Sequence, residues 1–368
     1  MNEADELRQA VREFLEVVSP AGRVRELMAT EEGFDPAVWR QMACELGLHG
    51  IAVPEEFGGA GATMSELAVV FEEMGAALLC APFFSTVALA TQAILCSGDT
   101  AAMKDYLPGF LDGSTTATLI LNGRLDAWDP HAVTLSARED DAGHVISGVA
   151  DLVLDGHTAD VVLVAANTAA GVSLFAVDAS ADGLTREPLA TLDRTRKVAR
   201  LGFDGVPARL IGTDGDAAAG LARTCDLATI ALAAEQVGAA QRCLDMAVAY
   251  AKERIQFGRA IGSFQAVKHR CADMLVAVEG ARSAAVHAAQ AAAGDELPVA
   301  CSVAKMACSE TLLQVSLDNM RIHGGIGFTW EHDAHLYVRR AKATELIFGS
   351  PDHHAQRLAA LVEPSSSH

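Results

Sequence analysis

The chain has 368 residues, a hydrophobic content of 51%, and 28 basic against 48 acidic residues, for a formal charge of −20. Such a composition is typical of a globular protein with a sizeable core, and it disfavours a disordered chain. The negative charge also disfavours sequence-independent binding to nucleic acid or to an anionic membrane surface.

The first residues, MNEADELRQAVREFL, are acidic where a signal peptide needs a basic start followed by an apolar run. No later stretch reaches the roughly 18 uninterrupted apolar residues of a membrane helix. We therefore expect a cytoplasmic protein that contacts no membrane.

The N-terminal part predicts helices. Residues 4–49 place apolar side chains three and four positions apart, and residues 51–63 then form a turn-rich loop with Pro54 and several glycines. Helical patterns return over residues 65–79 and 84–96. We predict an N-terminal helical domain over residues 1–112.

From about Ser114 the pattern changes to short runs of β-branched and aromatic residues separated by Gly, Asp and Asn. These runs are TTATLIL, AVTLSA, HVISGVADLVL, ADVVLVAA and VSLFAV. They predict a middle, β-barrel-like domain over residues 113–214.

The last part is helical again, with long Ala- and Leu-rich stretches over residues 221–254, 264–293 and 298–321. We predict a C-terminal four-helix bundle over residues 215–368. The fold class is therefore a multidomain α and β protein in which a β-barrel-like domain lies between two helical domains.

Two segments of this last domain suggest a ligand site. The first, AKERIQFGRAIGSFQ, contains Arg254, Gln256 and Phe257 before a turn at Gly258. Alone, it is more typical of a solvated helix end next to a core phenylalanine than of a ligand site. Four basic residues lie nearby: Lys252, Arg259, Lys268 and Arg270. They form either a solvated helix face or a site for nucleotide phosphate.

The second segment, MRIHGGIGFTWEHDAHLYVRRAKA, places Gly324 and Gly325 directly after a helix. Clustered glycines let backbone N–H groups approach a phosphate, although an ordinary interhelical turn has the same composition. The histidines of HDAH and of the later pair lack the spacing of metal ligands, so no metal site is expected.

In this order and within this arrangement of domains, the two segments resemble the acyl-CoA dehydrogenase family. The resemblance begins with LGLHGIAVPEEFGGAG and FEEMGAAL and runs to the end of the chain. It implies an FAD-dependent enzyme that converts an acyl-CoA thioester to the trans-2-enoyl-CoA. It also implies a homo- or hetero-tetramer and an electron acceptor such as an electron-transfer flavoprotein.

The resemblance further implies which residues contact FAD, across a subunit boundary. Arg254, Gln256, Phe257 and Gln265 match residues that contact its adenosine diphosphate half, and Gly324 and Gly325 match residues that approach its pyrophosphate. Arg321 stands where the family has a glutamine, and Ser350 matches a threonine that follows the family's base.

The catalytic base is the main departure from the family. Phe348 stands at its commonest position and Ala228 at its alternative position, so no catalytic residue is assigned. Asp226 lies two residues from the alternative position, but two helical steps turn its side chain by about 200°, which makes it a weak candidate. Glu235, further along, is more typical of a helix surface or a subunit contact. In the β domain, Leu154 stands where a threonine of the family contacts the flavin.

Three hypotheses remain open. The chain is an acyl-CoA dehydrogenase with a displaced base, or a catalytically silent, FAD-capping subunit of a heterotetramer whose partner carries the carboxylate, or a flavin-free structural or regulatory protein on the same fold. Loss of a positioned base costs about 10²- to 10⁴-fold in rate, so a homotetramer with Phe348 should be a poor dehydrogenase.

Overall fold

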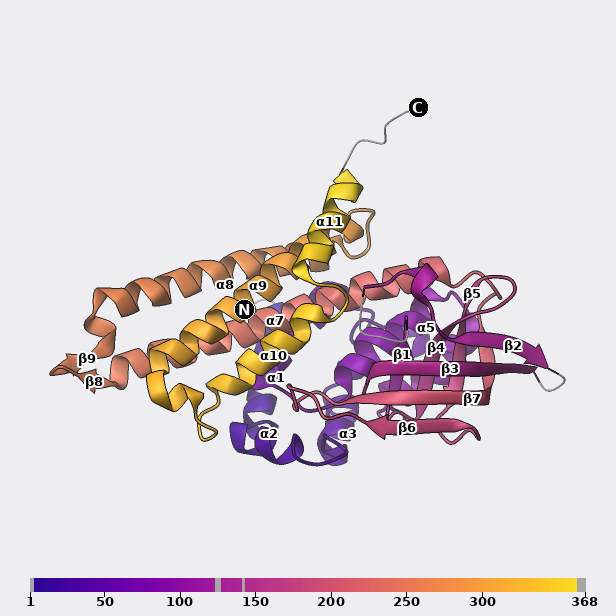
Figure 1. Ribbon diagram of the computed structural model, residues 1–368, viewed down its shortest axis with the longest axis horizontal. Coiled ribbons are helices and arrows are strands. Elements are labelled where there is room, and N and C mark those ends of the chain that lie inside the picture. Colours follow the sequence, from indigo (N-terminus) through magenta and orange to yellow (C-terminus); the bar gives the residue numbers. More distant parts are fainter. Residues whose placement is uncertain (1–2, 123–126, 141–142, 363–368) are drawn as a thin grey trace. The chain divides into compact units, whose positions relative to one another are not determined.

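The computed structural model describes residues 3–122, 127–140 and 143–362. They form two compact units. The helical unit comprises Met1–Val24, Met64–Leu79 and Thr229–His368, and the β-containing unit comprises Arg25–Thr63 and Cys80–Ala228. The predicted order of helical, β and helical segments is confirmed (Figure 1). The boundaries placed after residues 112 and 214 stay a prediction.

The helical unit is built around long helices that pack side by side (Figure 1). Its elements are α1 (Glu3–Val18), α4 (Met64–Ala77), most of α7 (Ala218–Glu253), α8 (Gln265–Ala291), α9 (Leu297–His323), α10 (Ala334–Leu346) and α11 (Pro351–Val362). The long helices match the predicted stretches to within a few residues at each end. Helix α9 contacts α8, α10 and α11, and it buries side chains on most of its circumference, as expected of a central helix.

Helices α4 and α7 cross at two glycines. A Cβ added to Gly238 would lie 1.7 Å from the carbonyl oxygen of Glu72, and one added to Gly75 would lie 2.0 Å from that of Glu235. These separations are far below any van der Waals contact, so each helix backbone touches the other where its partner has no side chain. The crossing therefore requires glycine at both positions.

The β-containing unit holds a seven-stranded sheet. Its strands are β1 (Ala117–Ile120), β2 (Ser136–Asp140), β3 (Gly143–Leu154), β4 (Val161–Asn167), β5 (Val172–Asp178), β6 (Leu184–Pro188) and β7 (Val198–Ile211). Antiparallel pairs join β4 to β5, β5 to β7, β7 to β3 and β3 to β2. The sheet closes where Ser136 of β2 pairs with Asn167 of β4. The barrel-like middle domain is thus confirmed, with β1 and β6 added to β4 and β7.

The barrel interior is filled by apolar side chains from every strand of the ring. Ile146, Val164, Phe175, Leu201 and Val206 are fully buried within one cluster. These residues are β-branched, leucine or aromatic, which pack well on a pleated surface. Hydrophobic burial therefore explains why the runs read from the sequence form strands.

The helices of this unit are α2 (Ala21–Leu27, which begins in the helical unit), α3 (Pro36–Cys44), α5 (Gln92–Cys96), α6 (Thr100–Leu111) and the first part of α7. Short 3-10 turns occur at Leu48–Gly50, Glu55–Phe57 and Pro130–Ala132. Residues 84–96 are helical as predicted, but the first eight, Phe84–Thr91, form a π-helix. The sequence pattern does not distinguish a π-helix from an α-helix. The wider winding of the π-helix depends on hydrogen bonds from its side chains to the barrel.

Candidate functional site

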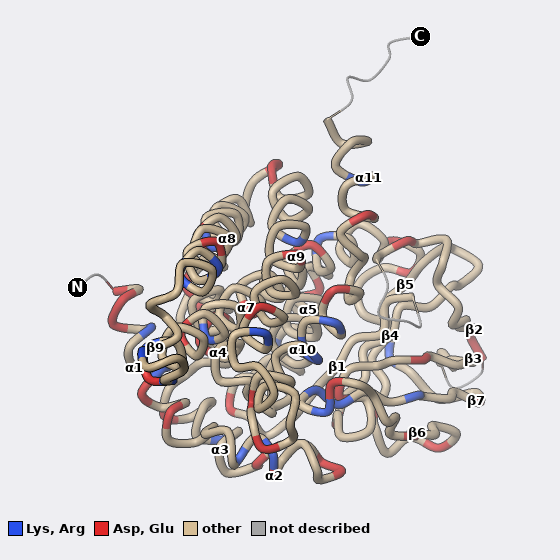
Figure 2. Tube along the Cα trace, turned by 60° about the vertical axis from the view of Figure 1, so that its left-hand side comes forward, with Lys and Arg blue, Asp and Glu red and all other residues tan. Residues whose placement is uncertain are grey.

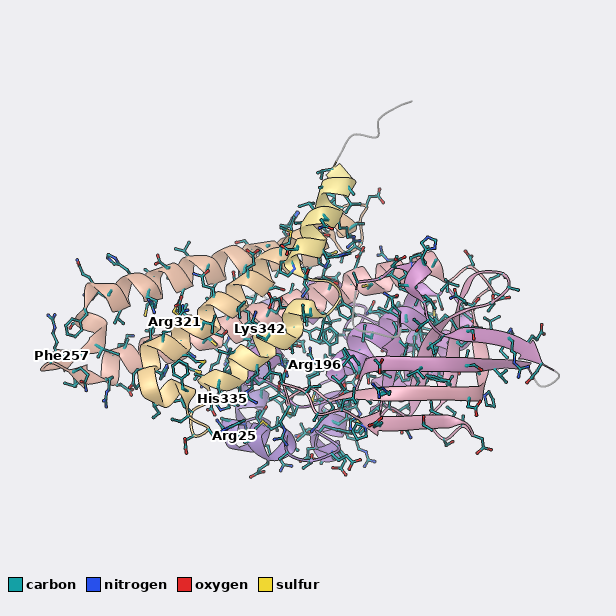
Figure 3. The ribbon with its side chains drawn as sticks, in the orientation of Figure 1. Arg25, Arg196, Phe257, Arg321, His335 and Lys342 are labelled. Carbon is teal, nitrogen blue, oxygen red and sulfur yellow. The ribbon has the colours of Figure 1, made fainter. Side chains whose placement is uncertain are left out.

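The two predicted ligand-binding segments lie at the same end of the helical unit. Tyr250, near the end of α7, stacks on His323, the last residue of α9, with ring centroids 4.3 Å apart. Arg270, in the first turns of α8, lies 3.6 Å from Asp318 of α9. Figure 3 labels Phe257 and Arg321 at this end. Segments about 65 residues apart in the chain are therefore neighbours in space.

Arg254, Gln256 and Phe257 belong to a tight hairpin that follows α7. Strands β8 (Ile255–Gln256) and β9 (Arg259–Ala260) pair, with Phe257 and Gly258 as the turn. Both turn residues have positive φ, 52° and 75°, as a two-residue type I′ turn requires. Phe257 is unusual in this conformation and its side chain is 90% exposed. The expectation that Phe257 belongs to the core is therefore wrong for the single chain.

Gly324 and Gly325 lie just beyond α9, at the start of a short 3-10 segment, Gly324–Phe328. A Cβ built at either glycine would meet no atom within 4 Å, so the backbone borders open space. Gly324 has φ 65° and ψ −140°, a conformation that is essentially restricted to glycine. This turn therefore offers an uncovered backbone, as an approaching phosphate would need.

The glycine turn gives a prediction that separates the effect of backbone conformation from the effect of steric crowding. We expect Gly324→Ala to lower the free energy of unfolding by about 1–2 kcal/mol, because alanine does not tolerate this φ and ψ. Gly325→Ala should change it little, since Gly325 lies outside the positive-φ region and is equally uncovered. Urea unfolding of the two variants measures the difference. Equal destabilisation would contradict the assignment of strain to Gly324.

Basic side chains surround this end of the unit. Arg321 and Arg270 share the carboxylate of Asp318, at 2.9 and 3.6 Å. Two guanidinium groups on one carboxylate leave an excess of positive charge in an otherwise acidic protein. Figure 2 shows Lys and Arg residues gathered near β9. Lys252, Arg254, Arg259 and Lys268 are all exposed.

Ser350 lies apart from these residues. It follows the far end of α10, a helix of 13 residues that starts near the glycine turn and spans about 20 Å. The hydroxyl of Ser350 accepts from the backbone N–H of His353 at 3.3 Å, so it caps α11. The structure thus groups Arg254, Gln256, Phe257, Gln265, Arg321, Gly324 and Gly325 at one end of the helical unit, and it groups Ser350 with Phe348.

The loop between α10 and α11 holds Phe348, the residue at the predicted base position. Its side chain is only 2% exposed, and its φ of 60° is exceptional for a bulky residue. The carbonyl of Phe348 accepts a hydrogen bond from His354 Nε2 at 2.9 Å. A buried phenyl ring cannot accept a proton, so this loop supplies no general base.

Lys305 of α9 holds the end of α10 directly before that loop. Its side chain is fully buried, and Nζ donates to the carbonyls of Thr344 (2.6 Å) and Glu345 (3.2 Å) and to the hydroxyl of Ser309 (3.1 Å). These carbonyls belong to the last turn of α10, where the helix leaves acceptors unpaired and a cation is favourable. Lys305 therefore fixes the helix end from which the Phe348 loop departs.

A buried ion pair joins α7 to α10 nearby. The guanidinium of Arg340 binds the carboxylate of Glu235, and both side chains are almost fully buried. Gln236 donates to the hydroxyls of Ser309 (3.1 Å) and Thr344 (3.0 Å). Sequence analysis missed this network, although a signal exists: Glu235 is the only charged residue between Asp226 and Arg242, in an alanine-rich stretch.

The alternative base position supplies no base either. Ala228 is fully buried in α7, in the part of that helix that belongs to the β-containing unit. Asp226 lies one half-turn before it and is also buried. The two side chains point in different directions on the helix, so Asp226 stays a weak candidate.

The histidine that holds the Phe348 loop predicts a dependence of stability on pH. Burial lowers the pKa of His354 from 6.5 to about 4. The hydrogen bond to Phe348 raises this pKa, whereas the positive charges of Lys305, Arg357 and His353 lower it further. Between these two pH values the unfolded chain binds a proton that the folded chain does not. The contribution of His354 to the free energy of unfolding is thus fully present above pH 6.5. It is lost as the pH drops towards 4, which lowers the free energy of unfolding by on the order of 3 kcal/mol.

Urea unfolding between pH 7 and pH 5 measures this slope, and His354→Gln is the variant that tests it. Glutamine retains a donor for the carbonyl of Phe348 but does not titrate. His49, whose pKa burial also lowers to about 4, should keep the remaining slope in the variant. An unchanged slope in His354→Gln would show that His354 is not responsible.

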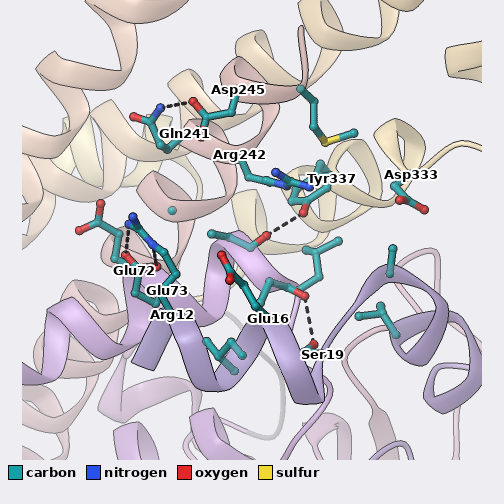
Figure 4. Close-up of a pocket in the computed structure, with 18 of the residues that line it drawn as sticks. Arg12, Glu16, Ser19, Glu72, Glu73, Gln241, Arg242, Asp245, Asp333 and Tyr337 are labelled. Carbon is teal, nitrogen blue, oxygen red and sulfur yellow. Dashed lines mark hydrogen bonds and ion pairs between the residues drawn. The ribbon is translucent and has the colours of Figure 1, made fainter. Parts of the chain in front are cut away.

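The helical unit also contains a cavity of about 920 Å³ between α1, α4, α7, α8 and α10 (Figure 4). Its wall carries ion pairs from Arg8 to Glu72 and Glu73 at 2.8 and 2.9 Å, and from Arg12 to Glu73 at 2.8 Å. Arg282 also binds Glu72. The predicted cofactor residues do not line this cavity, and its charges of both signs largely neutralise each other.

The described residues contain neither a membrane-spanning helix nor a cluster of metal ligands. In that part of the chain, each helix is too short or too polar to cross a membrane. Across residues 3–122, 127–140 and 143–362, no three His, Cys, Asp or Glu side chains are grouped so as to hold a metal ion.

Comparison with known proteins identifies the family. The model for the acyl-CoA dehydrogenase N-terminal domain matches residues 1–114, and that for the C-terminal domain matches residues 222–362. Acyl-CoA dehydrogenase IpdE2 of Mycolicibacterium smegmatis is 36% identical over 360 residues, which cover 98% of this chain and 99% of the relative. The chain therefore belongs to the acyl-CoA dehydrogenase family.

Solved structures agree with this. A variant of the Tcur3481-Tcur3483 steroid ACAD is similar with a TM-score of 0.87 and 35% identity, over 98% of this chain and 97% of that one. The ChsE4–ChsE5 complex from Mycobacterium tuberculosis is similar with a TM-score of 0.88 and 30% identity, over 99% of both chains. The chain is thus an acyl-CoA dehydrogenase by fold and sequence, and a flavin cofactor belongs to that family.

Proposed function

We propose that this chain serves the FAD-dependent dehydrogenation of an acyl-CoA thioester to the trans-2-enoyl-CoA, as a subunit that covers the dinucleotide half of an FAD bound by its neighbour. One observation supports this above all. Arg254, Gln256 and Phe257 project from a preformed hairpin beside the uncovered backbone of Gly324 and Gly325. In the single chain Phe257 is 90% exposed on a strained turn, with its ring edge-on to that of Phe264 at 6.1 Å, whereas a neighbouring chain with its dinucleotide would bury it.

The chemistry of each group fits this role. Guanidinium groups bind phosphate through charge-assisted hydrogen bonds, and Arg254, Arg321 and Arg270 all lie at this end. The glutamine amides and the backbone N–H groups of the glycine turn add neutral donors. When bound, the flavin supplies a hydride acceptor for the β-position of the acyl group.

The experiment compares flavin retention in two arginine variants of the protein purified with its neighbouring subunits. Arg254→Ala should weaken FAD binding about 10- to 100-fold, the effect of losing one charge-assisted hydrogen bond. The control is Arg138→Ala, since Arg138 is exposed on β2, far along the chain from the hairpin. Retained FAD is measured by its absorbance after gel filtration. An Arg254→Ala protein that keeps its flavin as the control does would contradict the proposed role.

A division of labour between unlike subunits is the second candidate, and buried Phe348 and Ala228 favour it. Both positions where the family carries its base are apolar and enclosed here, so the carboxylate that takes the α-proton would come from a partner chain. The two similar structures are each named for two different chains. We propose a heterotetramer that passes electrons to an acceptor such as an electron-transfer flavoprotein.

The similarity to a steroid dehydrogenase supports a substrate class as well. We propose that the assembly accepts the CoA thioester of a bulky, ring-containing acid rather than a straight fatty acid. Bleaching of the flavin by a steroid CoA ester, compared with palmitoyl-CoA at the same concentration, tests this. Faster bleaching by palmitoyl-CoA would reject the proposed class.

A further inference from the structure

The end of strand β3 and the start of the π-helix meet in the β-containing unit. Leu154 is the last residue of β3; its side chain is 1% exposed, and its carbonyl accepts from the hydroxyl of Thr118 at 2.6 Å. Asp155 follows with φ 49°, in the left-handed region that aspartate tolerates better than most residues. The turn therefore places the apolar side chain of Leu154 in the core, and the next residue, Asp155, carries a carboxylate.

The carboxylate of Asp155 is enclosed and already bonded within this unit. The residue is 8% exposed, and Oδ2 accepts from the hydroxyl of Ser85 at 2.7 Å. The backbone N–H of Asp155 donates to the carbonyl of Lys197 at 3.0 Å. Both ends of the residue are thus held by this chain's own atoms.

The π-helix explains how Ser85 reaches this turn. Its neighbour Thr86 is bonded to the barrel too: the hydroxyl of Thr86 accepts from the N–H of Ala117 at 3.0 Å and donates to the carbonyl of Ala117 at 3.1 Å. Two consecutive side chains can both face the barrel more easily in a π-helix, because each residue advances by a smaller angle than in an α-helix. The wide winding is therefore coupled to the closed turn at Asp155.

These groups do not suit an isoalloxazine ring. On reduction the ring gains negative charge at its N1 and C2 carbonyl edge, which N–H and O–H donors stabilise and a carboxylate opposes. The resemblance aligns Leu154 with a hydroxyl-bearing residue that contacts the flavin. Leucine has no donor, and an ionised aspartate only accepts hydrogen bonds.

We infer that Ser85, Leu154 and Asp155 fill the place where the β domain of this chain would otherwise bind a flavin ring, here called the flavin-ring seat. The chain then covers a neighbour's FAD but binds none in its own β domain. This rests on the proposed function for the covering role. It adds an asymmetry: flavin sites form only where this chain meets a subunit with an open seat. An assembly of two kinds of chain then holds half as many FAD molecules as chains, and the isolated chain holds none.

The test measures FAD per chain in the isolated protein after incubation with excess FAD and gel filtration. Wild type should elute essentially free of flavin. Asp155→Asn, which keeps the shape of the residue and adds a donor, should raise FAD affinity about tenfold, and Leu154→Thr/Asp155→Asn about 100-fold. Asp151→Asn is the matched control, because Asp151 lies on the same strand with an exposed carboxylate paired to Arg200.

Each result decides between the inference and the proposed function. One FAD per chain in the isolated wild type would overturn the closed seat, and loss of that FAD in Arg254→Ala would leave the covering role intact. A folded Asp155→Asn protein, checked by its thermal unfolding, that gains no affinity would also overturn the closure by these residues. If instead the isolated chain is flavin-free and the two-chain assembly keeps its flavin in Arg254→Ala, the proposed function fails while the closed seat stands.

Discussion

Gly238→Ala is expected to destabilise the protein by about 3 kcal/mol or more, because its methyl group would overlap the backbone of the crossing helix. The added Cβ would lie 1.7 Å from the carbonyl oxygen of Glu72 and 3.1 Å from the amide nitrogen of Ala76. Backbone atoms of a helix cannot move aside as a flexible side chain can. Relief requires α4 and α7 to separate, which also disturbs the ion pairs of Glu72. Urea or thermal unfolding measures the loss.

Gly280→Ala is the matched control for this substitution. Gly280 lies within α8, and a Cβ there meets nothing within 4 Å. Alanine should therefore stabilise the helix by about 0.5–1 kcal/mol through its higher propensity. Opposite signs at two helical glycines would show that the crossing, and not glycine content, sets the effect. If both substitutions stabilise the chain, the close approach of α4 and α7 is not a feature of the folded protein.

Arg340→Met is expected to cost about 3–5 kcal/mol, because it leaves Glu235 buried without this cation. The neighbouring Arg339→Met provides the control. Arg339 stacks over the exposed ring of Trp330 at 4.4 Å, and the loss of such a contact should cost only about 0.5–1 kcal/mol. Equilibrium unfolding of both variants gives the comparison.

A second change separates the buried charge from the lost packing. Glu235→Gln, added to Arg340→Met, removes the charge that Arg340 had neutralised and should restore a large part of the stability. If the double variant is as unstable as the sum of the single changes, Glu235 and Arg340 contribute independently and the ion pair is not the cause.

The sequence predicts the larger elements well because their patterns are periodic over many residues. The long helices α7, α8 and α9 and four of the five β runs appear where expected, since a face that must be buried repeats every 3.6 or every two residues. The run AVTLSA overlaps β2 only at Ser136 and Ala137, and the runs do not include β6 and β7. The π-helix at Phe84–Thr91 was not foreseen. Its winding depends on side-chain hydrogen bonds to groups 31 and 70 positions along the chain, which no local pattern records.

The candidate site was predictable in part. The hairpin and glycine turn could be located because special backbone conformations require few residue types, and the structure brings them together. Glu235 was expected on a helix surface or a subunit contact, yet it is buried in an ion pair. Its partner is 105 positions away, so only the fold reveals the pairing. Buried Lys305 was overlooked for the same reason.

In the proposed covering role, the hairpin at Phe257 also bears on how fast subunits assemble. Its two strands are already paired and its turn is already left-handed in the single chain. Docking therefore needs no disorder-to-order step, which is what commonly slows association. With so little of the binding element left to organise, encounter frequency should govern the association rate.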